Sequence, residues 1–146
     1  MGLDMNIYGE KSSFNEQKMD GFPIAGITLD LGYWRKHANL HGFIIQTFAD
    51  GEDNCQRIDL SKEDLLDIIE ALENDALYED GETTGFFFGR SIFPGEDGYE
   101  EQKDRDILTF RRALEWVKNA EPASGKYGED DYKWPEWRSV CYQASW

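Results

Sequence analysis

The sequence has few cysteines, few prolines and no long apolar run. Its 146 residues include two cysteines, Cys55 and Cys141, and four prolines. Two thiols this far apart, in a chain without the charged and apolar regions of a secretory signal peptide, predict reduced cysteines and no disulfide framework. No apolar run approaches the roughly 20 residues of a membrane-spanning helix. We therefore expect a cytoplasmic protein that does not cross a membrane.

Positive charge is also scarce. Acidic residues number 30 against 15 lysines and arginines, which gives a formal net charge of −15. This balance argues against direct binding to DNA or RNA, because their phosphates repel carboxylates. Hydrophobic residues still make up 40% of the chain and aromatic residues 14%, which is enough for a packed core. We expect residues 1–146 to fold as one domain.

The apolar residues follow patterns typical of both strands and helices. Strands are predicted at residues 3–9, 24–31, 55–60, 85–90 and 138–145. Amphipathic helices are predicted at residues 33–48, 61–78 and 99–119. The polar residues 10–22 predict a loop. This order of elements predicts an α+β fold, in which about three helices lie on one face of a mixed or mostly antiparallel sheet.

The predicted helix at 33–48 contains a glycine, Gly42, within an otherwise good helical pattern. Glycine inside a helix costs roughly 1 kcal/mol relative to alanine. We expect Gly42 to be there because another backbone or a large ring approaches the helix closely.

The same helix contains both histidines of the chain, His37 and His41. The helical period places His41 on the buried stripe and His37 at its border. Side chains at this spacing could bind a transition metal if Cys55 or Asp53 completed the ligands. The catalytic glutamate of a zincin is missing, however. We expect His41 to be a hydrogen-bonded core residue and His37 to be a surface residue. We expect the protein to bind no metal or other cofactor.

Cys55 gives rise to a second chemical hypothesis. With His41 as general base and Asp53 or Asp4 orienting the imidazole, Cys55 would be the nucleophile of a thiol hydrolase. No recognisable catalytic signature surrounds Cys55, and a free cysteine at the start of a strand is usually a small buried hydrophobic residue. The favoured interpretation is therefore not an enzyme, and the use of His41 with Cys55 and Asp53 is an alternative.

Acidic residues are concentrated between Asp59 and Glu101. This segment has fourteen acids against two cations, Lys62 and Arg90, and so carries −12 of the net charge of −15. Regularly spaced carboxylates on a helix face and its neighbouring loop attract basic grooves. The residues predicted to bind a partner are Asp67, Glu70, Glu73, Glu79, Asp80 and Glu82.

Five short motifs follow one another along the chain: GLDMNIY, YWRKHANLHGF, GEDNC, GFFFG and QASW. In this order they resemble an uncharacterised family of small phage, prophage and bacterial proteins. The resemblance spans most of the chain and maps onto Trp34, Arg35, Lys36, His41, Asp53, Cys55, Phe86 to Phe88 and Trp146. The chain departs from the family at His37, where alanine is typical, and at Asn54, which replaces an acid. The resemblance implies a mobile-element context, with no established activity.

Charge and resemblance together lead to a functional hypothesis. The protein is expected to be an acidic phage-type binding protein in the host cytoplasm, which engages a basic host protein. The negative charge would let the protein mimic nucleic acid and so inhibit a nuclease or a defence complex. Two alternatives stay open. One is an enzyme or metal-binding protein using His41, and the other is an acidic accessory protein whose charge serves solubility.

Overall fold

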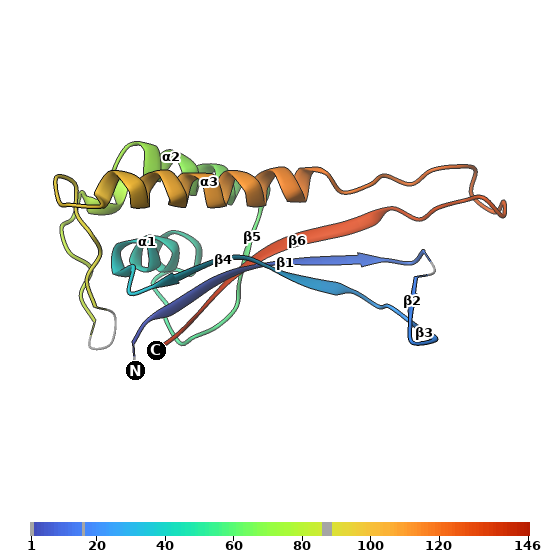
Figure 1. The fold of residues 1–146 in the computed structure, drawn as a ribbon, viewed down its shortest axis with the longest axis horizontal. Coiled ribbons are helices and arrows are strands. Elements are labelled where there is room, and N and C mark those ends of the chain that lie inside the picture. The colour runs from blue at the N-terminus through green and yellow to red at the C-terminus, as the bar shows by residue number, and fades with distance from the viewer. Residues whose placement is uncertain (1, 16, 86–88) are drawn as a thin grey trace.

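The computed structural model of the protein describes residues 2–15, 17–85 and 89–146. Within these ranges the strands are β1 (Asp4–Ser13), β2 (Lys18–Met19), β3 (Phe22–Pro23), β4 (Ile27–Arg35), β5 (Ile58–Leu60) and β6 (Glu136–Ser145). The helices are α1 (Ala38–Phe48), α2 (Lys62–Glu73) and α3 (Tyr99–Lys118), with a short 3-10 helix, η1 (Ala76–Tyr78). The main sheet is antiparallel in the order β4-β1-β6-β5, and the helices lie on one of its faces (Figure 1). The α+β prediction is confirmed.

Strand β1 is the centre of the sheet. It pairs with β4 from Asp4 opposite Arg35, and with β6 from Asp4 opposite Ser145. Successive side chains of a strand point to opposite faces. Leu3, Met5 and Ile7, which alternate in the sequence, are fully buried beneath the helices. The predicted half-buried strand is thus confirmed, although it runs further than residue 9.

Helix α2 begins with a reciprocal cap. The Ser61 hydroxyl accepts a hydrogen bond from the Asp64 backbone N–H at 3.1 Å, and the Asp64 carboxylate accepts one from the Ser61 N–H at 2.9 Å. The predicted apolar stripe of this helix is buried at Leu65, Ile68 and Ile69. Buried apolar residues of α3 lie on the same side, and α2 and α3 pack together as one layer.

Two glycines let α3 approach the sheet closely. A Cβ atom on Gly9 of β1 would lie 2.7 Å from the ring of Trp116, and one on Gly32 of β4 would lie 2.6 Å from Thr109. Real Cβ atoms do not come this close to other heavy atoms, so a larger residue would push the helix away. Gly42 of α1 is equally crowded, but by the side chain of Thr83. The close approach that we predicted at Gly42 is therefore present. The approaching group is a threonine side chain, however, and not the backbone or large ring that we expected.

Several predicted boundaries were wrong, including those of the strands predicted at 24–31 and 55–60, which run over Ile27–Arg35 and Ile58–Leu60. The helix predicted at 33–48 begins only at Ala38, because β4 keeps pairing with β1 as far as Arg35 and Lys36 then adopts a left-handed backbone with φ of 60°. The loop predicted at 10–22 contains the end of β1 and the β2–β3 pair. The helix predicted at 61–78 ends at Glu73, and η1 follows. Half of the strand predicted at 85–90, residues 86–88, lies outside the described residues, and residues 85, 89 and 90 are not in a strand.

A long extension projects away from the helix-covered part of the sheet (Figure 1). It is formed by the described residues between 11 and 27, which include the β2–β3 pair, and by residues 119–138, which lead from α3 into β6. We call these two segments the arm. In the described part of the chain, no helix has the length and apolar character needed to span a membrane.

Candidate functional site

His41 lies in α1 with only 1% of its surface exposed. Its Nδ1 is 2.5 Å from the Tyr142 hydroxyl of β6, and its Nε2 is 2.9 Å from Asp53 Oδ2. The Trp146 indole N–H donates to the other oxygen of Asp53 at 3.3 Å. Burial and the Asp53 carboxylate raise the pKa of Tyr142, so its hydroxyl stays protonated and donates to the imidazole. We call these four residues the Asp53 cluster.

His37 is the residue that precedes α1, and it is 2% exposed. Its Nδ1 is 2.8 Å from Ser91 Oγ, and its Nε2 is 2.8 Å from Asp106 Oδ2 in α3. The Trp34 indole N–H donates to Asp106 Oδ1 at 2.7 Å, and the Asn39 backbone N–H donates to Ser91 Oγ at 2.9 Å. Trp34, His37, Ser91 and Asp106 form the Asp106 cluster. The interpretation of His37 as a surface residue was wrong, because the chain enters α1 beneath α3 and the loop that carries Ser91.

The two clusters share one arrangement of groups. In each cluster, a hydroxyl is hydrogen-bonded to the Nδ1 of a histidine, and one carboxylate oxygen is hydrogen-bonded to its Nε2. A tryptophan indole N–H donates to the second carboxylate oxygen. Buried polar groups are stable only when they are hydrogen-bonded. Both clusters meet this condition, and they join α1 to the sheet on one side and to α3 on the other.

The Asp106 cluster contains the residue types of a serine hydrolase triad. Catalysis requires a serine that can reach a substrate, whereas Ser91 is 2% exposed and its oxygen already accepts the Asn39 N–H. The His37 ring is also reversed, since in a catalytic triad Nε2 faces serine and Nδ1 faces aspartate. This cluster is therefore part of the core.

The thiol hydrolase hypothesis needs a free imidazole nitrogen facing Cys55. Both nitrogens of His41 are hydrogen-bonded, one to Tyr142 and one to Asp53. The structure thus brings His41 and Asp53 together, but leaves the ring no nitrogen with which to activate a thiol. Asp4, the other proposed orienting residue, accepts a hydrogen bond from Tyr33 at 2.5 Å on the sheet face away from the helices. Cys55 lies in the turn before β5, half-buried, with φ of 62°.

His37 and His41 point into different clusters, so the structure does not bring them together as a pair of metal ligands. Across residues 2–15, 17–85 and 89–146, no three histidine, cysteine, aspartate or glutamate side chains gather in an arrangement that could hold a metal ion.

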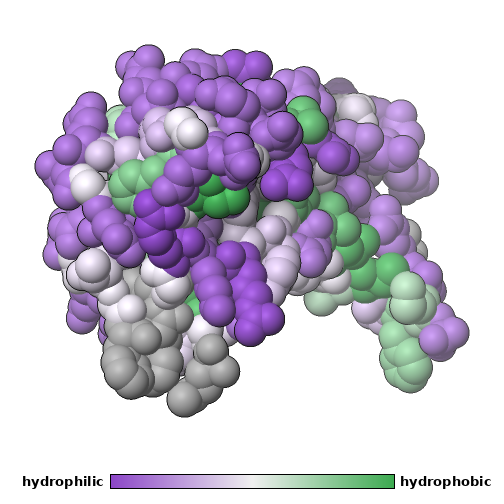
Figure 2. Space-filling view, turned by 60° about the vertical axis from the view of Figure 1, so that its left-hand side comes forward, coloured by the Kyte–Doolittle hydropathy of each residue, from purple (hydrophilic) through white to green (hydrophobic). Residues whose placement is uncertain are grey.

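The acids predicted to bind a partner are all exposed on α2 or in the loop that follows η1. Hydrophilic residues cover the top of the molecule in Figure 2, where α2 and α3 lie. Two of the acids are already in ion pairs. Glu73 pairs with Arg111 of α3, and Glu82 lies 3.9 Å from Arg90. The acidic surface is thus partly neutralised at its edges.

The loop that carries Ser91 is fixed by one ion pair. Both terminal nitrogens of Arg90 donate to the Glu96 carboxylate, at 2.7 and 2.9 Å, and Glu96 also accepts the Phe93 backbone N–H at 2.9 Å. Arg90 first and then the Phe93 N–H hold the pKa of Glu96 at about 2.

We expect an NMR titration of the Glu96 carboxyl to have a midpoint near pH 2. Since this pKa lies below that of the unfolded chain, the stability it contributes is present above about pH 4.3 and is lost as the pH falls towards 2. Arg90→Gln should raise the midpoint, and Arg112→Gln on the exposed face of α3 should leave it unchanged. A midpoint that is the same with and without Arg90 would contradict this assignment.

Four of the motifs behind the family resemblance meet at the end of the sheet where both termini lie (Figure 1). The Lys36 N–H donates to the Leu3 carbonyl at 2.8 Å, and Trp146 reaches Asp53 through the bond described above. No family model matches the chain, and neither a curated protein nor a solved structure matches it significantly. The family resemblance therefore stays a prediction.

Sequence reasoning did not find Ser91, Asp106 or Tyr142. For Asp106 a signal was present, because it precedes Phe110 by four residues and Val117 by eleven, on the inward side of α3. A carboxylate in a buried stripe requires a partner, and this could have directed attention to His37. For Ser91 we find no such signal in the sequence.

Proposed function

We propose that the protein is a non-enzymatic binding protein whose acidic surface engages a basic host protein. The observation that carries this proposal is the position of Asp67 and Glu70, which are exposed on the face of α2 opposite the buried stripe. Glu79 and Asp80 extend the exposed acids beyond η1. The engagement of both imidazoles in buried hydrogen bonds supports binding over catalysis.

The ion pairs at the edges of this surface are compatible with partner binding. Exposed pairs such as Glu73 with Arg111 are worth only about 0 to 1 kcal/mol, so basic groups of a partner can replace them. Exposed carboxylates in a row present negative charge much as a phosphate backbone does, and complementary charge accelerates association. A nuclease or a defence complex, whose groove binds nucleic acid, is the partner class that we propose.

The proposal predicts that charge reversal on α2 removes partner binding. The protein should capture a basic partner from host lysate at low salt, with an association rate that falls steeply as ionic strength rises. Asp67→Lys combined with Glu70→Lys should weaken that binding at least about tenfold, a loss of about 1.4 kcal/mol. Surface changes of this kind alter stability by about 0.5 kcal/mol or less each.

The matched control is Asp104→Lys combined with Glu115→Lys, which makes the same charge change at exposed positions of α3. If this control weakens binding equally, net charge and not the α2 surface is responsible. Binding that persists in the α2 variant and at high salt would refute the proposal. Loss of solubility without loss of a partner would favour the accessory role.

A further inference from the structure

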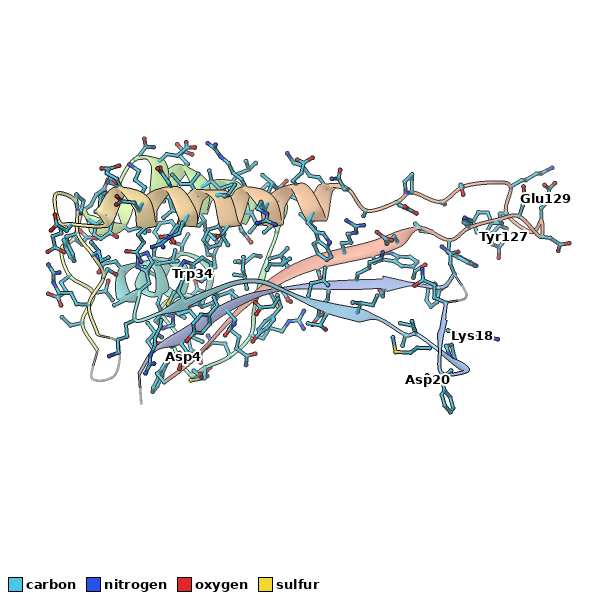
Figure 3. The ribbon with its side chains drawn as sticks, viewed as in Figure 1. Asp4, Lys18, Asp20, Trp34, Tyr127 and Glu129 are labelled. Carbon is cyan, nitrogen blue, oxygen red and sulfur yellow. The ribbon has the colours of Figure 1, made fainter. Side chains whose placement is uncertain are left out.

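The arm carries the most exposed large apolar side chains of the described chain. Tyr127 is 75% exposed, Phe14 74% and Phe22 73%. Figure 2 shows apolar residues along the projection at the lower right, which is the branch of the arm that carries Lys18 and Asp20 in Figure 3, whereas Tyr127 lies near the tip of the other branch. Contiguous exposed apolar surface on a soluble protein marks an interaction site.

Five aromatic rings of the arm are in contact: Tyr127, Tyr132 and Trp134 all pack against one another, and the row continues from Trp134 through Phe14 to Trp137. Consecutive ring centroids are 5.2 to 5.9 Å apart, and consecutive rings are nearly perpendicular, at 74° to 86°. Edge-to-face contact is a favourable arrangement of aromatic rings.

Backbone hydrogen bonds fix the row in place. Asn15 binds the backbone of Trp134 twice, accepting from its N–H at 2.9 Å and donating to its carbonyl at 3.1 Å. Ser124 and Lys133 exchange two further backbone bonds of 2.9 and 3.0 Å. These bonds fix the backbone that carries Trp134 before any partner arrives.

Two hollows lie along the row and share Phe14. One, of about 350 Å³, is apolar and is lined by Phe14, Ile24 and Trp137 with Pro23. The other, of about 620 Å³, is lined by Phe14 and Trp134 and by acids. The acids lining this second hollow are Glu121, Asp130, Asp131 and Glu136, against one lysine, Lys133, and of these acids Glu136 is already paired with Lys11 and Arg138. The row thus combines an apolar part with a negatively charged part.

We propose that the arm binds an extended proline-rich peptide segment that carries arginine or lysine. Proline-rich chains adopt the polyproline II conformation without internal hydrogen bonds and dock into aromatic-lined grooves. Proline rings of the segment occupy the apolar hollow lined by Phe14, Pro23 and Trp137. Its cations pair with Asp130 and Asp131 and lie over the rings of Trp134 and Tyr132. The acids of the second hollow argue against a nucleic acid there.

The test uses the full-length protein and three synthetic peptides of about ten residues. The first alternates prolines with arginines, the second has glutamates in place of the arginines, and the third has alanines in place of the prolines. Isothermal titration calorimetry should detect binding of the first peptide. The second and third should bind at least about tenfold more weakly.

Variants assign the binding to the arm. Tyr127→Ala, and Asp130→Asn combined with Asp131→Asn, should each weaken binding of the first peptide about tenfold. Leu108→Ala is the matched control, since this α3 side chain is 56% exposed and lies outside the arm. Asp67→Lys combined with Glu70→Lys should leave peptide binding unchanged, which separates this proposal from that of the acidic surface.

Three results would overturn the proposal. The first is that no peptide binds, and the second is that all three peptides bind equally. The third is that analytical ultracentrifugation shows a dimer that Tyr127→Ala converts to monomers. The last result would make the aromatic row an interface between two copies of the chain.

Discussion

Replacing Asp106 with alanine should lower the free energy of unfolding by about 3 to 5 kcal/mol. Asp106 is 3% exposed, and its two carboxylate oxygens accept from Trp34 and from His37. Its removal leaves two buried donors without an acceptor, and each such donor costs about 1 to 3 kcal/mol. Loss of the side chain also leaves a small cavity between α3 and the sheet.

Urea denaturation followed by circular dichroism measures this loss. Asp104→Ala, at an exposed position two residues earlier in α3, should change stability by about 0.5 kcal/mol or less. Asp106→Asn should lie between the two, because the amide oxygen satisfies one donor while the amide nitrogen faces the other. If Asp106→Ala unfolds at the same urea concentration as Asp104→Ala, the Asp106 cluster does not stabilise the core.

The elements that the sequence predicted well are those with local signals. Helix α2 has its cap at Ser61 and its apolar stripe within one continuous segment, and the longer helix α3 has its own apolar stripe and is followed by Pro122. Strand β1 alternates between half-buried and buried residues from Asp4 to Gly9. Such signals depend on neighbours in the chain, so they are readable without the fold.

The start of α1 shows where local signals fail. Trp34, Ala38 and His41 have helical spacing, and the residues between them include no proline or glycine. Pairing of Arg35 with Asp4 nevertheless keeps this segment in the sheet. A strand partner about 30 residues away in the sequence outweighs a helical preference of a few tenths of a kcal/mol per residue.

The candidate site was predictable only in part. His41 and Asp53 are 12 residues apart and were considered together as a general base and the carboxylate that orients it. Their third partner, Tyr142, is 101 residues from His41, and Asp106 is 69 residues from His37. These contacts depend on how β6 and α3 pack against α1, which no local pattern encodes.

His41→Ala should lower the free energy of unfolding by about 1 to 3 kcal/mol. The substitution creates a cavity at a fully packed position and removes the acceptor of the buried Tyr142 hydroxyl. Thermal and urea denaturation measure the loss. Gln46→Ala, at an exposed position of the same helix, is the control and should change stability little. An unchanged melting temperature for His41→Ala would mean that the imidazole does not stabilise the core.

A double-mutant cycle separates the hydrogen bond from the cavity. Tyr142→Phe keeps the ring but removes the hydroxyl that donates to His41 Nδ1. If the two groups depend on each other, the double variant should lose less stability than the two single variants together, by about 0.5 to 3 kcal/mol. This follows because the single variants each leave one buried polar group without a partner, while the double variant leaves neither. Strict additivity would show that the 2.5 Å contact between His41 and Tyr142 contributes nothing to the stability of the fold.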